Sequence, residues 1–161
     1  MLFRSPIVLD GAMGSELEER GYRLSDLLWS ATALIEEPDA IASVHRDYVA
    51  AGADVLISAS YQASRWGFEK EGRSGDDADR QMLESIALAR AAAATGDHDV
   101  LVAASVGPYG AVLGGGQEYV GNYGLTKKQL VDFHRERLAV LASGQPDAFA
   151  CETIPDLLEV E

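Results

Sequence analysis

Cysteine is almost absent from this sequence, and its scarcity excludes several kinds of site. Cys151 is the only cysteine among 161 residues. The chain therefore cannot form an intrachain disulfide, and it cannot supply several cysteines to one zinc ion. A protein without disulfides suits a reducing compartment, so we expect a cytoplasmic location.

Long hydrophobic runs and basic residues are also scarce. No apolar run approaches the ~20 residues needed to span a bilayer, and the first residues lack the pattern of a signal peptide. The chain has 13 basic and 26 acidic residues, so its formal net charge is −13. Because nucleic acids and anionic lipids are bound through basic residues, we expect neither nucleic acid nor a membrane as a partner. The acidic excess would attract a cationic small molecule, or it serves only to keep helix surfaces solvated.

The sequence does contain a repeat of short, strand-like segments separated by helical patterns. The segments are residues 7–10, 55–60, 100–105 and 148–153, and a glycine and then an aspartate precede the last three. Pro38 suits the first turn of one helix, and Ser74 marks the start of the next. Thr126 and Gln129 form a capping-box pattern at the start of a third.

This order of elements predicts an α/β fold with a parallel sheet. The strand segments are nearly continuous apolar runs, which is typical of strands covered on both faces. Two architectures fit: a flavodoxin-like doubly wound sheet and part of a (β/α)₈ TIM barrel. Four strands in a chain shorter than the ~250 residues of a complete barrel favour about the first four βα units, a half barrel. The open edges of such a sheet invite association, so we expect a homo-oligomer or a missing C-terminal half.

Polar residues and glycines gather where the four strand segments end, which is where functional groups lie in parallel α/β proteins. Asp10 and Glu152 each end an apolar strand, where an unpaired carboxylate would be costly. One interpretation is a pair of acids that binds a substrate ammonium group. The other is an aspartate that caps the next turn and a glutamate paired with an arginine. Cys151 should point to the opposite face of its strand from Glu152 and pack inertly against helices.

Two glycine-rich segments and the histidines give weaker signals. Residues 11–14 form only a G-x-x-G, and no G-K-[ST] is present, so a nucleotide site is weakly supported. Residues 109–125 form a long connection that contains three consecutive glycines. It is either a lid with a glycine hinge or a loose connection. The three histidines are far apart in sequence and do not indicate a metal site.

Six motifs in register resemble the homocysteine S-methyltransferase family. The opening motif, LDGAMGSEL, is similar to the family's D-G-[AG]-M-G-[ST]-E-L. The six motifs cover residues 9–17 (LDGAMGSEL), 28–31 (LWSA), 51–55 (AGADV), 58–63 (SASYQA), 105–111 (SVGPYGA) and 150–153 (ACET). They follow in the family's order over essentially the whole chain. The Tyr-Gln-Ala version most resembles the branch that takes its methyl group from S-methylmethionine or S-adenosylmethionine.

The resemblance implies a TIM-barrel transferase of methionine biosynthesis that moves a methyl group from a sulfonium donor to homocysteine. It implies that Asp10 and Glu152 hold the homocysteine amino group and that Gly11 lets the backbone approach the substrate. No residue is assigned a catalytic role. The expected substrate-binding residues are Asp10, Gly11, Ser60, Tyr61, Gln62 and Glu152.

The resemblance also implies zinc, but this chain lacks the family's ligands. In the family three cysteines bind the zinc, one after a late strand and an adjacent pair near the C-terminus, and nothing here matches them. Residues 1–161 are therefore interpreted as the N-terminal portion of a homocysteine-binding domain, a partial methyltransferase that is not expected to act alone. The alternative is a non-catalytic amino-acid-binding or regulatory α/β module completed by a partner chain. A flavodoxin-like nucleotide binder is a third hypothesis, without a phosphate-loop motif to support it.

Overall fold

A small parallel sheet lies at the centre of the structure, a computed structural model that describes residues 6–22 and 29–161. Its strands are β1 (Val55–Ile57), β2 (Leu101–Val106) and β3 (Ala148–Cys151), in the order β1-β2-β3. Neighbours in the sheet are thus successive strands in the chain. The α/β class and the parallel pairing that the repeat predicted are confirmed.

The first predicted strand, residues 7–10, forms only one parallel bridge, between Leu9 and Val55. The carbonyl oxygen of Val8 still accepts hydrogen bonds from the N–H groups of Asp54 (2.8 Å) and Val55 (3.2 Å). The segment therefore lies along β1 and extends the sheet in the predicted order. Its pairing is too short to count as a full strand.

Strand β1 also ends earlier than the sequence predicted, at Ile57 instead of residue 60. The reason is local, because the N–H of Ser60 donates to the carbonyl oxygen of Ser58 (2.8 Å). This bond closes a tight turn that extended backbone cannot make. The three polar residues after β1 therefore belong to a turn at the strand's carboxyl end.

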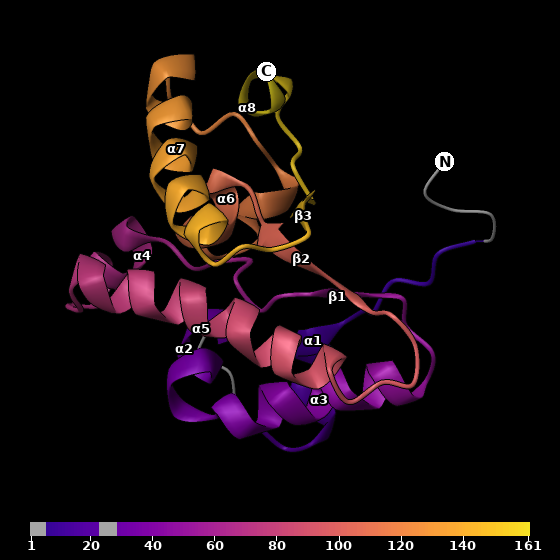
Figure 1. Cartoon of the computed structure of the whole chain (residues 1–161). Helices are drawn as coiled ribbons and strands as arrows, with labels where there is room; N and C mark the ends of the chain where they lie inside the picture. The colour runs from indigo at the N-terminus through magenta and orange to yellow at the C-terminus, as the bar shows by residue number, and fades with distance from the viewer. Residues whose placement is uncertain (1–5, 23–28) are drawn as a thin grey trace.

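Helices connect the strands and pack in a layer beside the sheet. Their bounds are α1 (Met13–Glu19), α2 (Trp29–Glu36), α3 (Pro38–Ala50), α4 (Arg65–Lys70), α5 (Gly75–Ala93), α6 (Tyr109–Leu113), the 3₁₀ turn η1 (Gln117–Tyr119), α7 (Lys127–Ser143) and α8 (Leu157–Val160). Helix α5 contacts α3 on one side and α7 on the other, and Figure 1 shows α5 between them. The longest helices of the chain thus lie side by side.

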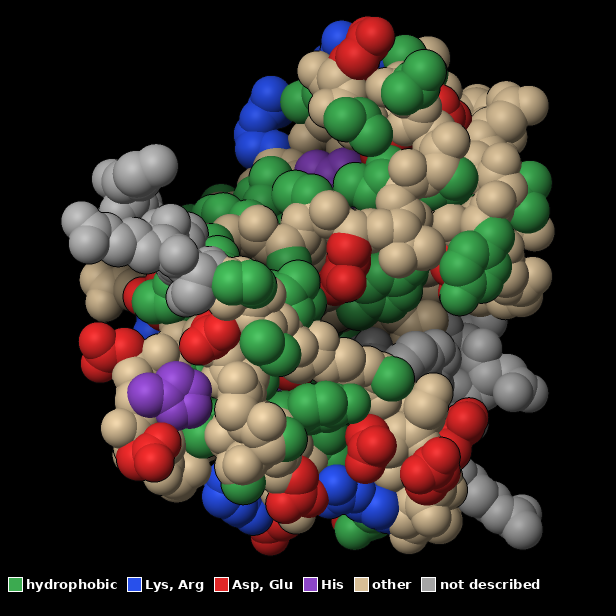
Figure 2. All heavy atoms as spheres, turned by 90° about the vertical axis from the view of Figure 1, so that its right-hand side faces the viewer, with side chains coloured by type: hydrophobic (Ala, Val, Ile, Leu, Met, Phe, Trp, Pro, Cys, Tyr) green, Lys and Arg blue, Asp and Glu red, His purple; other side chains and the backbone are tan. Residues whose placement is uncertain are grey.

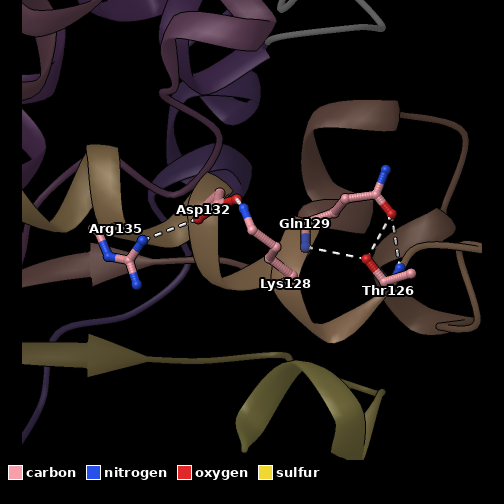
Figure 3. Close-up of polar contacts among 5 residues, drawn as sticks. All are labelled: Thr126, Lys128, Gln129, Asp132 and Arg135. Carbon is pink, nitrogen blue, oxygen red and sulfur yellow. Dashed lines mark hydrogen bonds and ion pairs between the residues drawn. The ribbon is translucent and has the colours of Figure 1, made fainter.

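The predicted helix starts are confirmed by their capping geometry. Pro38 occupies the first turn of α3. The Ser74 hydroxyl accepts from the N–H of Asp77, and the Asp77 carboxylate accepts from the N–H of Ser74, both at 3.1 Å. At α7 the same exchange joins Thr126 and Gln129, and Figure 3 shows both bonds. Each box satisfies two N–H groups that a helix start would otherwise leave unpaired.

The main hydrophobic core lies between the sheet and α5. It takes Leu56 from β1 and Val102 from β2, which face Met82 and Ile86 of α5. A second cluster joins Leu17 of α1 to the helices that follow it. These side chains are almost fully buried. The periodic apolar face of α5 therefore fixes the helix layer on the sheet, which holds the strand ends in place.

Two of the three aspartates in the recurring Gly–Asp pattern tie neighbouring strands together. The Asp54 carboxylate accepts from the N–H of Val8, and the Asp147 carboxylate accepts from the N–H of Val102, each at 2.8 Å. Asp147 also pairs with Arg90 at 2.5 Å. Each aspartate thus ties the start of its own strand to the start of the preceding one. These two aspartates thus help to align neighbouring strands.

The outer face of β3 is open. Phe149 is 43% exposed and Cys151 is exposed as well. The prediction that Cys151 packs inertly against helices is therefore wrong, because the side chain stays exposed on β3, which is an edge strand of the described sheet. Figure 2 shows hydrophobic side chains gathered across the middle of one face of the molecule, with acidic side chains among them. Within the described ranges, no helix is long and apolar enough to cross a membrane.

Candidate functional site

A cavity of about 780 Å³ opens at the carboxyl ends of the strands. Its wall takes residues from the turn before α1, from the ends of β1 and β2, from η1 and from the segment after β3. The repeat predicted functional groups at these ends, and the structure brings four strand ends together around one space. The lining includes Asp10, Tyr61, Ser105 and Glu152.

Asp10 lies at the end of the first strand segment, and its side chain is 3% exposed. Its Oδ2 accepts a hydrogen bond from the N–H of Ile57 (3.0 Å) and lies 3.7 Å from Nδ1 of His45. The His45 ring is buried, and neither ring nitrogen has a hydrogen-bond partner in the structure. The interpretation of Asp10 as a residue that caps the following turn does not describe this geometry. Asp10 instead joins its own segment to β1.

Gly11 follows Asp10 on the cavity wall. A Cβ atom at Gly11 would lie 3.5 Å from the Tyr48 hydroxyl, which is ordinary van der Waals contact. Gly11 is thus not required by crowding inside the fold. The predicted close approach of its backbone to a substrate stays a prediction.

Glu152 reaches the cavity from the end of β3. The Ser105 hydroxyl donates a short hydrogen bond to Oε1 of Glu152, and the N–H of Glu152 donates to the carbonyl oxygen of Val106 (3.2 Å). The N–H of Ser105 in turn donates to the Ser58 hydroxyl (3.2 Å). The Ser105 hydroxyl therefore holds the Glu152 carboxylate at the end of the sheet, and the Ser58 hydroxyl holds the backbone of Ser105. The alternative partner, an arginine, is not among these contacts.

Three residues after β1 are predicted to bind substrate, and the structure places one of them on the cavity wall and buries the other two. Tyr61 lines the cavity. Ser60 and Gln62 are buried and are not on the cavity wall. The Ser60 hydroxyl donates to the carbonyl oxygen of Ser105 (2.8 Å), and the Gln62 amide donates to that of Ala111 (3.1 Å). In this structure Ser60 and Gln62 therefore brace the strand-end loops, and their predicted substrate contact stays a prediction.

The Tyr61 ring is held by close packing. A Cβ atom at Gly107 would lie 2.6 Å from the ring, so only glycine fits there. Burial raises the pKa of Tyr61 to about 12, and the carboxylates of Glu118 and Glu152 act in the same direction. A phenol with this pKa keeps its proton at neutral pH. Tyr61 can therefore offer a hydroxyl group and an aromatic face to the cavity.

Arg137 of α7 is a site-forming residue that the sequence interpretation missed. It is 1% exposed, and its guanidinium donates to the carbonyl oxygens of Gly107 (2.9 Å), Ser60 (3.1 Å) and Tyr61 (2.9 Å). Burial lowers the pKa of Arg137 to about 10, so the side chain is still charged at neutral pH. It clamps the two loops that follow β1 and β2. The available signal was its position on the apolar stripe of α7, seven residues after Leu130.

The cavity is acidic. Asp10, Glu18, Glu118 and Glu152 all line it, and no lysine, arginine or histidine is among the described residues of its wall. Two of these carboxylates come from the strand ends and two from the flanking α1 and η1. Such a wall favours a ligand that carries positive charge.

The long connection of residues 109–125 is folded in part. It contains α6 and η1, and η1 places Glu118 and Tyr119 on the cavity wall. The loose-connection interpretation is therefore wrong for this part of the segment. The interpretation as a moving lid stays a prediction.

The homocysteine S-methyltransferase family model matches residues 7–161. The chain belongs to this family. It is 46% identical, over 96% of its length, to homocysteine S-methyltransferase YbgG of Bacillus subtilis, and 48% identical, over the same share, to homocysteine S-methyltransferase 4 of Zea mays. It covers 52% and 49% of those two proteins, so it spans about half the length of these relatives. The resemblance seen in the six motifs is confirmed.

A solved structure of the homocysteine S-methyltransferase family has the same local fold. The metallated form of the homocysteine methyltransferase MmuM from Escherichia coli matches with a TM-score of 0.90 and 43% identity. The match covers 98% of this chain and 57% of that one. The fold of this chain is therefore that of a part of the MmuM structure.

The resemblance implies zinc ligands, and the described part of this chain does not provide them. Within residues 6–22 and 29–161, no group of three or more His, Cys, Asp or Glu side chains could hold a metal ion. The single cysteine is exposed on β3. His45, His98 and His134 each lie near a different carboxylate. The described residues thus do not fit a zinc site, and we derive no step that passes through zinc.

Proposed function

We propose that this chain is part of a homocysteine S-methyltransferase and that it holds the amino-acid end of homocysteine. One observation carries the proposal. Asp10 and Glu152, from the first and the last strand segment, line the same cavity although 142 positions separate them in the sequence. Two carboxylates on one wall suit an ammonium group, which can donate a hydrogen bond to each.

The proposed reaction transfers a methyl group from the sulfur atom of the donor to the sulfur atom of homocysteine within this cavity. A new bond forms between the homocysteine sulfur and the methyl carbon, while the bond from that carbon to the donor sulfur breaks. The electron pair stays on the donor sulfur, which changes from a sulfonium to a neutral thioether. The thiol proton must leave first, and we assign that step to none of the described residues.

The contribution of this chain is to position the substrate. Asp10 is fixed by the N–H of Ile57, and Glu152 is fixed by the Ser105 hydroxyl. Neither carboxylate has to reorganise when the ammonium group arrives, so the amino acid is bound in one orientation. Holding the attacking sulfur in line with the methyl carbon replaces a costly bimolecular encounter.

We also propose that the sheet continues into a complete (β/α)₈ barrel. The order of the strands, the exposed edge of β3 and the half-length coverage of the relatives support this. The strands that complete the barrel would come from the missing C-terminal half or from another copy of the chain.

The test of the amino-acid site is homocysteine binding by the full chain, measured by titration calorimetry. Asp10→Asn and Glu152→Gln should each weaken binding by at least about tenfold, or ~1.4 kcal/mol. Glu84→Gln, at an exposed position of α5, is the matched control and should bind as the original chain does. If both cavity variants bind homocysteine with unchanged affinity, the assignment of the site is wrong.

A non-catalytic amino-acid-binding module is the second candidate function. The observation that favours it is the chemistry of the wall, where the described residues offer carboxylates and hydroxyls but no thiol or imidazole. An assay of methyl transfer from S-methylmethionine to homocysteine distinguishes the two candidate functions. The assay is run on a mixture of this chain and the C-terminal half of a relative, and on each part alone. Turnover by the mixture, and not by either part, supports the partial enzyme. Homocysteine binding without turnover in the mixture supports the binding module.

A further inference from the structure

His45 is a fully buried histidine that lies behind the wall of the cavity. It belongs to α3, which packs against both α1 and β1, and its side chain has no exposed surface. It does not line the cavity, so it is not a group that the ligand touches. A buried polar ring needs an explanation, because burying a polar group without a hydrogen bond is costly.

The polar group that the His45 ring approaches is the carboxylate of Asp10. Nδ1 of His45 lies 3.7 Å from Oδ2 of Asp10, and both side chains are buried. Among the described residues, neither Nδ1 nor Nε2 makes a hydrogen bond. A small tilt of the ring would shorten the distance to the ~3.0 Å of an N–H···O bond. Hydrogen bonds in active sites are often long in the free protein and shorten in the complex. This contact is placed to behave in that way.

The surroundings of the ring favour one position of its proton. With the proton on Nε2, a buried N–H would lack an acceptor among the described residues, and Nδ1 would turn a lone pair toward the carboxylate. With the proton on Nδ1, the N–H lies on the side of the carboxylate, and only an acceptor nitrogen stays unpaired. The His45 ring can therefore serve Asp10 as a neutral donor.

A neutral donor suits a carboxylate that has to bind an ammonium group. The two polar contacts that the described residues make with the Asp10 carboxylate, from the N–H of Ile57 and from His45, are both to Oδ2. Oδ1 is thus the oxygen left for a ligand in the cavity. A cationic partner on Oδ2 would compete with the ammonium group for the negative charge. A neutral N–H holds the carboxylate in place and leaves its charge intact.

We propose that His45 is a positioning residue of the amino-acid site, which holds the Asp10 carboxylate through Nδ1–H when homocysteine binds. The role rests on the proposed function, because His45 acts only through Asp10. The ring moves toward Oδ2 while the ammonium group binds Oδ1, and hydrogen bonds that share one acceptor group in a buried site reinforce each other. Removing the Nδ1 donor therefore weakens homocysteine binding, although His45 does not touch the ligand.

The test compares two amide substitutions at the same position. In His45→Asn the amide nitrogen is bonded to Cγ, as Nδ1 is in histidine, so a donor to Asp10 is kept. In His45→Gln the amide lies one bond further out, at the place of Nε2, so that donor is lost while the side chain stays polar. Each change is also combined with Asp10→Asn. Homocysteine is titrated into the full chain and followed by NMR.

His45→Gln should weaken homocysteine binding by about tenfold, or ~1.4 kcal/mol, and His45→Asn by less than about threefold. In the Asp10→Asn background, His45→Gln should cost less than about twofold, because residues that act through one contact are not additive. A merely structural role would give the same loss in both backgrounds. That result, or unchanged binding by His45→Gln, would overturn the positioning role while the proposed function stands.

The nitrogen signals of the His45 ring test the same role in the original chain, so the result does not depend on whether a variant folds. They should show the proton on Nδ1, and the Nδ1–H signal should move downfield when homocysteine binds. A proton on Nε2, or an unmoved signal in the complex, would contradict the role of His45. If homocysteine does not bind the original chain at all, the proposed function is wrong, and the role of His45 falls with it.

Discussion

A single buried cation connects α7 to the loops of the candidate site. The Arg137 guanidinium donates to three backbone carbonyl oxygens, and two of them belong to the turn that carries Tyr61. Backbone carbonyls in a turn cannot pair with a strand, so a side chain must satisfy them when they are buried. Arg137 thus links the stability of the fold to the position of the cavity wall.

Replacing Arg137 with methionine should therefore be strongly destabilising. The change fills similar space but removes the side-chain donor from three carbonyl oxygens, of which that of Ser60 keeps only the N–H of Ala63 (3.0 Å). We therefore expect the free energy of unfolding to fall by about 2–4 kcal/mol. Urea unfolding measures this loss. Arg135→Met is the control, because Arg135 is exposed on the same helix and pairs with Asp132 at the surface (Figure 3). An equal, small loss in both variants would show that the clamp does not stabilise the fold.

At the level of single residues, the positions of polar groups could be predicted from the sequence, but the direction of their side chains could not. Asp10 and Glu152 could be predicted because a carboxylate at the end of an apolar strand needs a partner. Ser60, Tyr61 and Gln62 share one motif, yet only Tyr61 lines the cavity. The turn after β1 decides this, and its geometry depends on Arg137, which is 76 residues away from Tyr61.

At the scale of elements, the starts of helices were easier to predict than the ends of strands. A capping box needs only two residues three positions apart, so Ser74 and Thr126 indicated the starts of α5 and α7 correctly. The end of β1 depends on a turn bond within its own loop. The pairing of residues 7–10 depends on the neighbouring strand. Local patterns do not contain that information.

The aspartates before the strands predict how the sheet responds to acid. The N–H of Val102, and then Arg90, hold the pKa of Asp147 below its usual value. The unfolded chain has the higher pKa, so the stabilisation is complete above about pH 4 and is lost as the pH falls through the lowered pKa of the folded state. Protonation releases the tie between the starts of β2 and β3.

Asp147→Asn should therefore destabilise the chain at neutral pH, and the loss should shrink as the pH falls through the lowered pKa of Asp147. Since Asp147 is partly exposed, we expect a loss on the order of 1 kcal/mol at pH 7. Thermal unfolding of both chains from about pH 3 to pH 7 measures the difference. Asp76→Asn, in the exposed first turn of α5, is the matched control. A difference that is the same at every pH would show that the Asp147 charge is not responsible.

At the scale of the whole molecule, the sheet has two open edges. Phe149 on β3 is 43% exposed, and at the other edge Val8 and Leu9 are 52% and 58% exposed. The sequence predicted these edges from the number of βα units. It could not predict how much apolar surface they would leave uncovered, because that depends on side chains at both edges and near α8.

An exposed strand with an apolar side chain is a template for association, and a lysine on such an edge opposes it. We therefore expect the chain to associate with itself as its concentration rises, and Phe149→Lys to weaken that association by about tenfold, or ~1.4 kcal/mol. Sedimentation velocity over a range of concentrations measures both. Val131→Lys, which changes a comparably exposed apolar residue on α7, should associate as the original chain does. If both variants associate equally, the contact lies elsewhere. If only Phe149→Lys stays monomeric, the open edge of β3 is the surface through which two copies associate.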